Sequence, residues 1–125
     1  ALPIFESYLM RSTVLTDPDL SRGELEGRLN ELTITDPTLA EKTRKVCLAL
    51  YDLTIAHQSN DYFEDLSNDF KYQQLEIIYY QALNATLKGD QHRANELFHK
   101  LVSEDESLYI VRKAKKYLRD EGSHL

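Results

Sequence analysis

Residues 70–103 read FKYQQLEIIYYQALNATLKGDQHRANELFHKLVS, and this stretch predicts a helical hairpin. In its first arm, apolar and small residues recur at steps of three and four, which places one face of a helix at Leu75, Ile78, Tyr79, Ala82, Leu83 and Thr86. Gly89 is expected to end this arm in the left-handed conformation, and Asp90 to cap the second arm. The second arm carries its apolar stripe at Ala94, Leu97, Phe98 and Leu101. Two such stripes predict helices that bury their faces against each other and against further helices.

The composition favours an all-α fold. The 125 residues include only four glycines and three prolines, and they show neither a strongly alternating strand pattern nor an Asn-Gly hairpin turn. We expect one domain, residues 1–125, built from six or seven helices. The expected architecture is a set of antiparallel hairpins, arranged either as a superhelix of helix pairs or as an irregular bundle.

Capping residues and prolines divide the first half of the chain into helices. We expect a first helix over residues 4–15, followed by a second that begins at a capping box formed by Ser21 and Glu24. A long central helix is expected over residues 37–58, because Asp36 can cap it and a proline suits its first position. These three helices are expected to lie before the hairpin.

The second half of the chain is expected to begin with a short helix or turn over residues 62–66. The first arm of the hairpin then covers residues 70–88, and a C-terminal helix covers residues 104–122. The acidic residues 104–106 are expected to open that helix, because negative charge complements the positive end of the helix dipole. Gly122 is expected to end it.

The hairpin resembles a tetratricopeptide repeat in a small residue, a Gly-Asp turn, an alanine and an aromatic residue, at Ala82, Gly89, Asp90, Ala94 and Phe98. The repeat pattern would have an apolar residue at Gln81, an aromatic residue at Ala85 and a proline at Glu106. The resemblance covers about one repeat of roughly 34 residues, in the C-terminal half only. It implies a domain that binds a peptide or a partner protein on the first helix of the hairpin, through Tyr72, Gln73, Glu76, Tyr80 and Asn84. A generic helical bundle is the alternative.

The net charge of −6 argues against general nucleic-acid binding, because the phosphate backbone would be repelled. The positive charge is concentrated, since five of the fifteen basic residues fall within residues 112–119. Four of them form one face of the C-terminal helix, namely Arg112, Lys115, Lys116 and Arg119. This basic stripe is either an ordinary solvated face or a surface that attracts an acidic partner segment or a second copy of the chain.

The sequence contains no recognisable catalytic constellation, so we expect a protein that is not an enzyme and that needs no cofactor. Cys47 lies between apolar residues and is expected to be a buried, unreactive thiol. His92, Glu96 and His99 share metal-ligand spacing, but the apolar stripe of their helix directs them toward solvent, and no second Glu-x-x-His motif occurs. We therefore expect no metal site.

Three hypotheses for function stay open: an interaction domain for a protein or peptide, a regulatory or sensor module from a larger signalling protein, and a helical bundle that binds a metal or small ligand. No run approaches the roughly 18 apolar residues of a membrane span, so none is expected. A single cysteine slightly favours the cytoplasm. The first residue is Ala1, so a removed leader would make the protein periplasmic or secreted.

Overall fold

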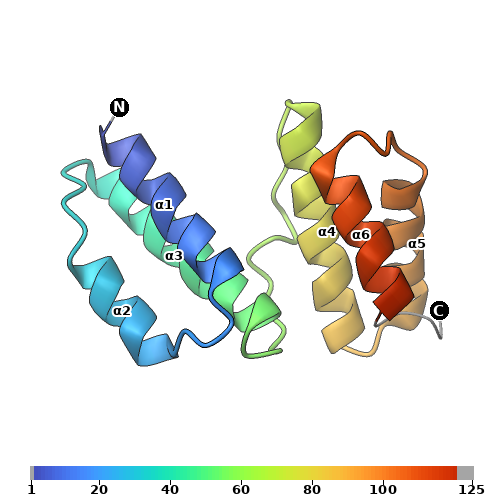
Figure 1. Cartoon of the computed structure of the whole chain (residues 1–125), viewed down its shortest axis with the longest axis horizontal. Coiled ribbons are helices and arrows are strands. Elements are labelled where there is room, and N and C mark those ends of the chain that lie inside the picture. Colours follow the sequence, from blue (N-terminus) through green and yellow to red (C-terminus); the bar gives the residue numbers. More distant parts are fainter. Residues whose placement is uncertain (1, 121–125) are drawn as a thin grey trace. The chain divides into compact units, whose positions relative to one another are not determined.

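The computed structural model describes the backbone of residues 2–120 and the side chains of residues 6–120. Over this range the fold is all-α, as predicted, with no strand (Figure 1). The helices of the described range are α1 (Leu2–Thr16), α2 (Arg22–Asn30), α3 (Pro37–Thr54), α4 (Lys71–Leu87), α5 (Gln91–Val102) and α6 (Tyr109–Asp120). None of them combines the length and the apolar character that a membrane crossing requires.

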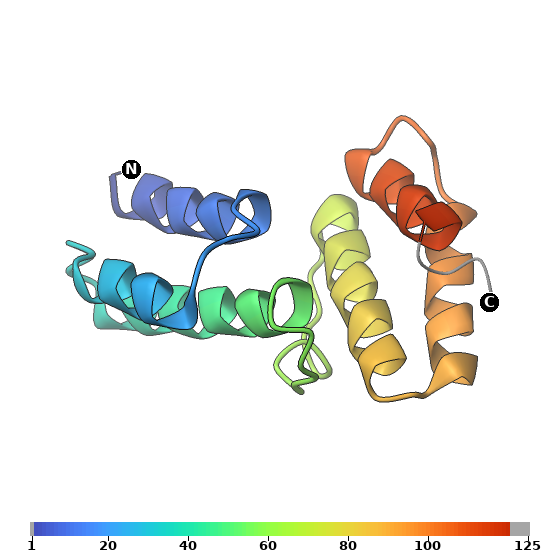
Figure 2. The same ribbon diagram turned by 60° about the horizontal axis from the view of Figure 1, so that its bottom comes forward.

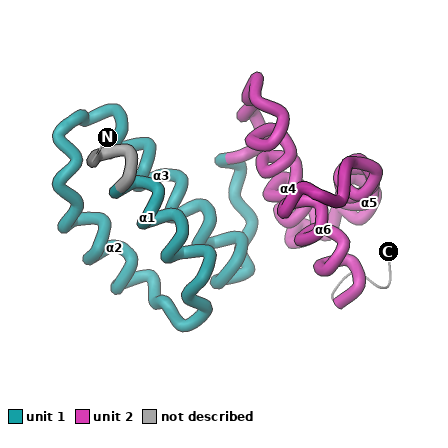
Figure 3. Tube along the Cα trace, turned by 45° about the horizontal axis from the view of Figure 1, so that its top comes forward, with its two compact units in different colours: residues 1–62 teal, residues 63–125 magenta. Residues whose placement is uncertain are grey.

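The chain divides into two compact units, residues 1–62 and residues 63–125 (Figure 3). The expected single domain stays a prediction. Unit 1 contains α1, α2 and α3, and unit 2 contains α4, α5 and α6. The boundary falls in the irregular segment between α3 and α4. Each unit has buried apolar side chains from all of its helices.

In unit 1, α1 and α3 lie side by side and run in the same direction (Figures 1 and 2). Their second turns are joined by a hydrogen bond of 2.7 Å between the hydroxyl groups of Ser7 and Thr43. Since the Thr43 hydroxyl also donates to the Leu39 carbonyl at 2.7 Å, Ser7 is the donor to Thr43. This contact satisfies Thr43, a fully buried polar side chain of the unit 1 core.

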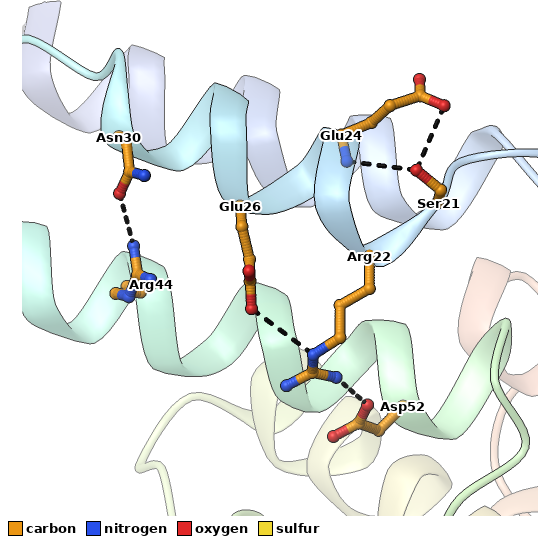
Figure 4. Close-up of polar contacts among 7 residues, drawn as sticks. All are labelled: Ser21, Arg22, Glu24, Glu26, Asn30, Arg44 and Asp52. Atoms are coloured by element: carbon orange, nitrogen blue, oxygen red, sulfur yellow. Dashed lines mark hydrogen bonds and ion pairs between the residues drawn. The ribbon is translucent and has the colours of Figure 1, made fainter.

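The short helix α2 runs antiparallel to α3 and is held by polar contacts at both ends (Figure 4). At its start, Arg22 donates to Asp52 near the end of α3, with 2.5 Å between Nη1 and Oδ1. At its end, the Asn30 amide oxygen accepts from Arg44 at 2.9 Å. Half of the predicted capping box is confirmed, because the Ser21 hydroxyl accepts from the Glu24 backbone N–H at 3.1 Å. The Glu24 carboxylate accepts from the Ser21 hydroxyl at 3.2 Å.

The predicted start of α3 is confirmed, but its predicted end at residue 58 is wrong. Asp36 accepts from the backbone N–H groups of Thr38 and Leu39, and a proline occupies the first turn. The helix ends at Thr54, and the backbone of His57 then takes a left-handed conformation with φ of 54°. The chain therefore turns away one helical turn before the polar residues expected to stop it.

Unit 2 is built on the predicted hairpin. Gly89 has φ of 79° and ends the first arm in the left-handed region, which lets its N–H and that of Asp90 reach carbonyls in the last turn of α4. The Asp90 carboxylate accepts from the Arg93 N–H at 3.2 Å and caps α5. The helices α4 and α5 form the most extensive packing in the unit, and α6 packs against both.

An aromatic cluster centred on Phe98 joins the three helices of unit 2. Phe98 is 1% exposed, and its ring lies edge-on to Tyr79 of α4 and stacked on Tyr117 of α6, with centroid distances of 6.3 and 5.2 Å. The predicted core position of Phe98 is confirmed. Lys113 of α6 places its ammonium group 5.5 Å from the centre of the Tyr79 ring, a cation–π contact, and burial lowers the pKa of this lysine.

The C-terminal helix begins later than predicted, at Tyr109 rather than at residue 104. The acidic residues 104–106 lie in the preceding loop, where Asp105 accepts from the Ser107 N–H at 2.9 Å. Two of them pair with lysines: Glu104 with Lys71, and Glu106 with Lys115. The predicted stop at Gly122 lies outside the described residues.

Candidate functional site

The five residues of α4 predicted to bind a partner do not form one exposed surface. Gln73 is exposed and Tyr72 and Glu76 are half-buried, as a surface role requires. Tyr80 and Asn84 are instead only 3% and 1% exposed, so the predicted exposure of these two side chains is wrong. Both are covered by a segment of unit 2 that precedes α4.

That covering segment is the turn at Phe63 and Glu64. The Phe63 ring packs on Tyr80 with 5.0 Å between ring centres. The Gln81 side-chain amide donates to the Phe63 carbonyl at 2.7 Å and, more weakly, to the Glu64 carbonyl at 3.4 Å. These bonds explain how the polar Gln81 is tolerated at a buried position where the repeat pattern has an apolar residue.

The Glu64 carboxylate is bound by side chains from two helices. The Asn84 amide of α4 donates to Oε1 at 2.7 Å, and the Arg93 guanidinium of α5 lies 2.7 Å from Oε2. Burial by itself would raise the pKa of Glu64, but these bonds and the nearby Lys88 outweigh it and hold the pKa below its ordinary value of 4.5. The ionised carboxylate is therefore part of what holds this turn on α4 and α5.

We expect this carboxylate to make the stability of unit 2 dependent on pH. Because the folded chain lowers the Glu64 pKa, the contribution is present above about pH 4.5 and is lost as pH falls through the folded-state pKa. At pH 7, Glu64→Gln should lower the free energy of unfolding by about 1.5 kcal/mol, as for hydrogen bonds to a charged group. Guanidinium denaturation from pH 3 to pH 7 measures the difference between wild type and variant.

The difference should shrink as the solution is acidified. Asp65→Asn is the matched control, since Asp65 is the exposed neighbour of Glu64 and should give a small difference at every pH. A Glu64→Gln difference that stays constant down to pH 3 would contradict the assigned role of the charge.

The predicted basic stripe on α6 is partly engaged by the loop before the helix. Arg112 donates to the backbone carbonyls of Glu106 and Ser107 at 3.0 and 2.7 Å. Lys115 pairs with Glu106, whereas Lys116 is exposed. The remaining member, Arg119, is exposed and lies 3.5 Å from its neighbour Asp120. Arg112 and Lys115 therefore hold the loop that precedes α6, and these contacts make them less available to a partner.

A different surface is formed where α4 and α6 begin. Tyr72 is half-buried there, and the first turn of α6 lies close to its hydroxyl, with Tyr109 and the Ile110 backbone nearby. Burial raises the pKa of Tyr72, and the nearby Glu76 and Tyr109 raise it further. The predicted residues Tyr72, Glu76 and Arg112, which come from two helices, are therefore brought together.

Two large apolar side chains are exposed at these helix starts. Phe70 precedes α4 and is 72% exposed, and Tyr109 opens α6 and is 60% exposed. We call Phe70, Tyr72 and Tyr109 the aromatic surface. Of these three residues only Tyr72 was predicted from the sequence as a binding residue. Tyr109 could not be predicted in this way, because its place beside Tyr72 depends on the packing of α6 on α4.

The residues considered for chemistry lie in unreactive settings. Cys47 is fully buried, as predicted, and burial raises the pKa of its thiol to about 11, which leaves it protonated at neutral pH. His92 and Glu96 form an exposed pair, with 2.7 Å between Nε2 and Oε1, and His99 is exposed. Within residues 2–120, three or more potential metal ligands are nowhere gathered into one group.

Comparisons of the chain with protein-family models, with curated protein sequences and with solved structures found no match. The resemblance to a tetratricopeptide repeat therefore stays a prediction that rests on the residues of the hairpin.

Proposed function

We propose that the chain is a non-enzymatic helical interaction module that binds a peptide segment of a partner protein on the aromatic surface. The observation that supports this most is the exposure of Phe70 and Tyr109, 72% and 60%, at neighbouring helix starts. Exposed apolar residues that gather at one place are typical of recognition sites, and aromatic rings contribute large contact area at small entropic cost.

The direction of the helices supports the same proposal. The helices α4 and α6 pack against each other and run in the same direction (Figure 1). In tetratricopeptide repeats, helices in these two positions line the partner-binding surface. The module would then use Tyr72, Gln73 and Glu76 of α4 together with Tyr109 of α6.

The partner segment should carry an apolar anchor. Phe70 and Tyr109 offer exposed aromatic rings, while Gln73 and Glu76 of α4 provide polar groups. Such an arrangement, an apolar centre with a polar rim, is the ordinary anatomy of a small protein interface.

Selection of peptides from a displayed library on the intact chain tests this proposal. Enriched peptides should bind wild type and should bind Tyr109→Ala at least about tenfold more weakly, equivalent to about 1.4 kcal/mol. Tyr8→Ala is the matched control, because Tyr8 is also a tyrosine and is 66% exposed, but belongs to α1 of unit 1. Peptides that bind both variants as tightly as wild type would refute the aromatic surface as the binding site.

A further inference from the structure

The side chains that hold Phe63 and Glu64 form a second surface, separate from the aromatic surface. They come from the last turns of α4 and the first turn of α5, and they are Tyr80, Gln81, Asn84 and Arg93. We call these four residues the inner site. Tyr80 contacts Phe63, Asn84 and Arg93 contact Glu64, and Gln81 contacts both.

The inner site binds both backbone and side-chain groups of Phe63 and Glu64. Gln81 binds two successive carbonyl groups, which any peptide offers, and Tyr80 packs on an aromatic ring. Asn84 and Arg93 together bind both oxygens of one carboxylate. Main-chain hydrogen bonds combined with pockets for particular side chains are the common means of peptide recognition.

The segment that contains Phe63 and Glu64 is irregular, and the residues that connect it to α4 are exposed. Residues 62–65 form turns rather than a helix, and residues 65–70 are all exposed. Phe63 is 5% exposed, so it is the buried anchor of this segment, and the Glu64 side chain is 17% exposed. A short anchor pair in a turn, followed by an exposed connection, has the form of a tethered ligand.

We propose that the inner site is a peptide-recognition site for partner segments in which an aromatic residue is followed directly by glutamate, and that Phe63 and Glu64 occupy it as an internal ligand. The chemistry of the occupant is given by the contacts in the chain itself: a ring for Tyr80, a carboxylate for Asn84 and Arg93, and two backbone carbonyls for Gln81. This proposal does not depend on the aromatic surface.

The tether determines when an outside segment can bind. A segment joined by a short flexible connection has an effective concentration of about millimolar, so a free peptide of equal affinity at micromolar concentration does not displace it. A partner must therefore bind more tightly or be held by another contact. The internal ligand therefore prevents peptides of low affinity from occupying the inner site.

A peptide with the chain's own sequence over residues 58–69, QSNDYFEDLSND, is the probe. The full chain with the double substitution Phe63→Ala and Glu64→Ala should bind this peptide, and wild type should bind it at least about tenfold more weakly because of the tether. Calorimetry measures the affinity, and amide chemical shifts should change at Tyr80, Gln81 and Arg93.

Variants of the peptide distinguish specific recognition from non-specific binding. Replacing its phenylalanine or its glutamate by alanine should weaken binding to the opened chain about tenfold each, whereas alanine at the position of the exposed Asp65 should leave it unchanged. Arg93→Glu in the opened chain should also abolish binding. Tyr109→Ala should have no effect, so a failure of the aromatic surface would not be mistaken for a failure here.

A folded double variant, as judged by circular dichroism, that does not bind the peptide overturns the proposal. If the double variant does not fold, wild type is titrated with peptide to about 10 mM, where the free peptide exceeds the effective concentration of the tethered segment. Shift changes confined to the inner site then support the proposal. Their absence at that concentration overturns it.

Discussion

Replacing Phe98 by alanine is expected to lower the free energy of unfolding of unit 2 by about 3 to 5 kcal/mol, as for other buried phenylalanines. The ring is 1% exposed and touches aromatic side chains on both neighbouring helices, Tyr79 of α4 and Tyr117 of α6. Its removal leaves a cavity between three helices and also removes two aromatic contacts, which are worth about 0.5 to 1.5 kcal/mol each beyond their area.

Lys100→Ala is the control for this prediction. Lys100 lies two residues further along α5 and is exposed, so its truncation should change stability by less than about 0.5 kcal/mol. Guanidinium denaturation followed by circular dichroism measures both variants, and amide hydrogen exchange in α4, α5 and α6 assigns the loss to unit 2. Equal losses for the two variants would show that Phe98 is not the anchor of the hairpin.

The hairpin could be predicted from sequence because its signals are local. The spacing of the apolar residues gives the helical faces, Gly89 supplies the left-handed turn and Asp90 the cap, and all three act within a few residues of where they stand. The start of α3 at Asp36 was predictable for the same reason.

The burial of Tyr80 and Asn84 could not be predicted in this way. It arises from Phe63 and Glu64, which lie about one hairpin arm earlier in the chain and belong to a turn with no periodic pattern. Gln81 was the only residue of the sequence that indicated a covering segment over this part of α4. A polar residue within an otherwise buried stretch needs partners, and here those partners are the carbonyl groups of the covering turn.

The acidic residues before α6 illustrate a second limit. Their charge suited the start of a helix, yet the helix begins at Tyr109 and the carboxylates of Glu104 and Glu106 pair with Lys71 and Lys115. A nearby lysine on another turn or helix competes with the helix dipole, whose effect is comparable to that of an exposed ion pair. Sequence spacing alone does not decide that competition.

The helix α2 provides the other large expected effect, because it depends on very few apolar contacts. It has nine residues, two of them glycine, and only Leu25 and Leu29 are buried. Glycine in a helix interior costs about 1 kcal/mol relative to alanine, and an isolated helix of this length is unstable in water. Packing of these two leucines in unit 1 must therefore supply most of its stability.

Leu25→Ala is expected to lower the free energy of unfolding by about 2 to 5 kcal/mol, since Leu25 is completely buried. Leu9→Ala is the matched control: Leu9 is 47% exposed in α1 and should cost much less. Hydrogen exchange should show α2 losing protection before α1 and α3, because Arg22 and Asn30 hold its ends only through exposed polar contacts of small net value. If α2 keeps its protection in Leu25→Ala, the polar contacts and the capping box, rather than the leucines, stabilise this helix.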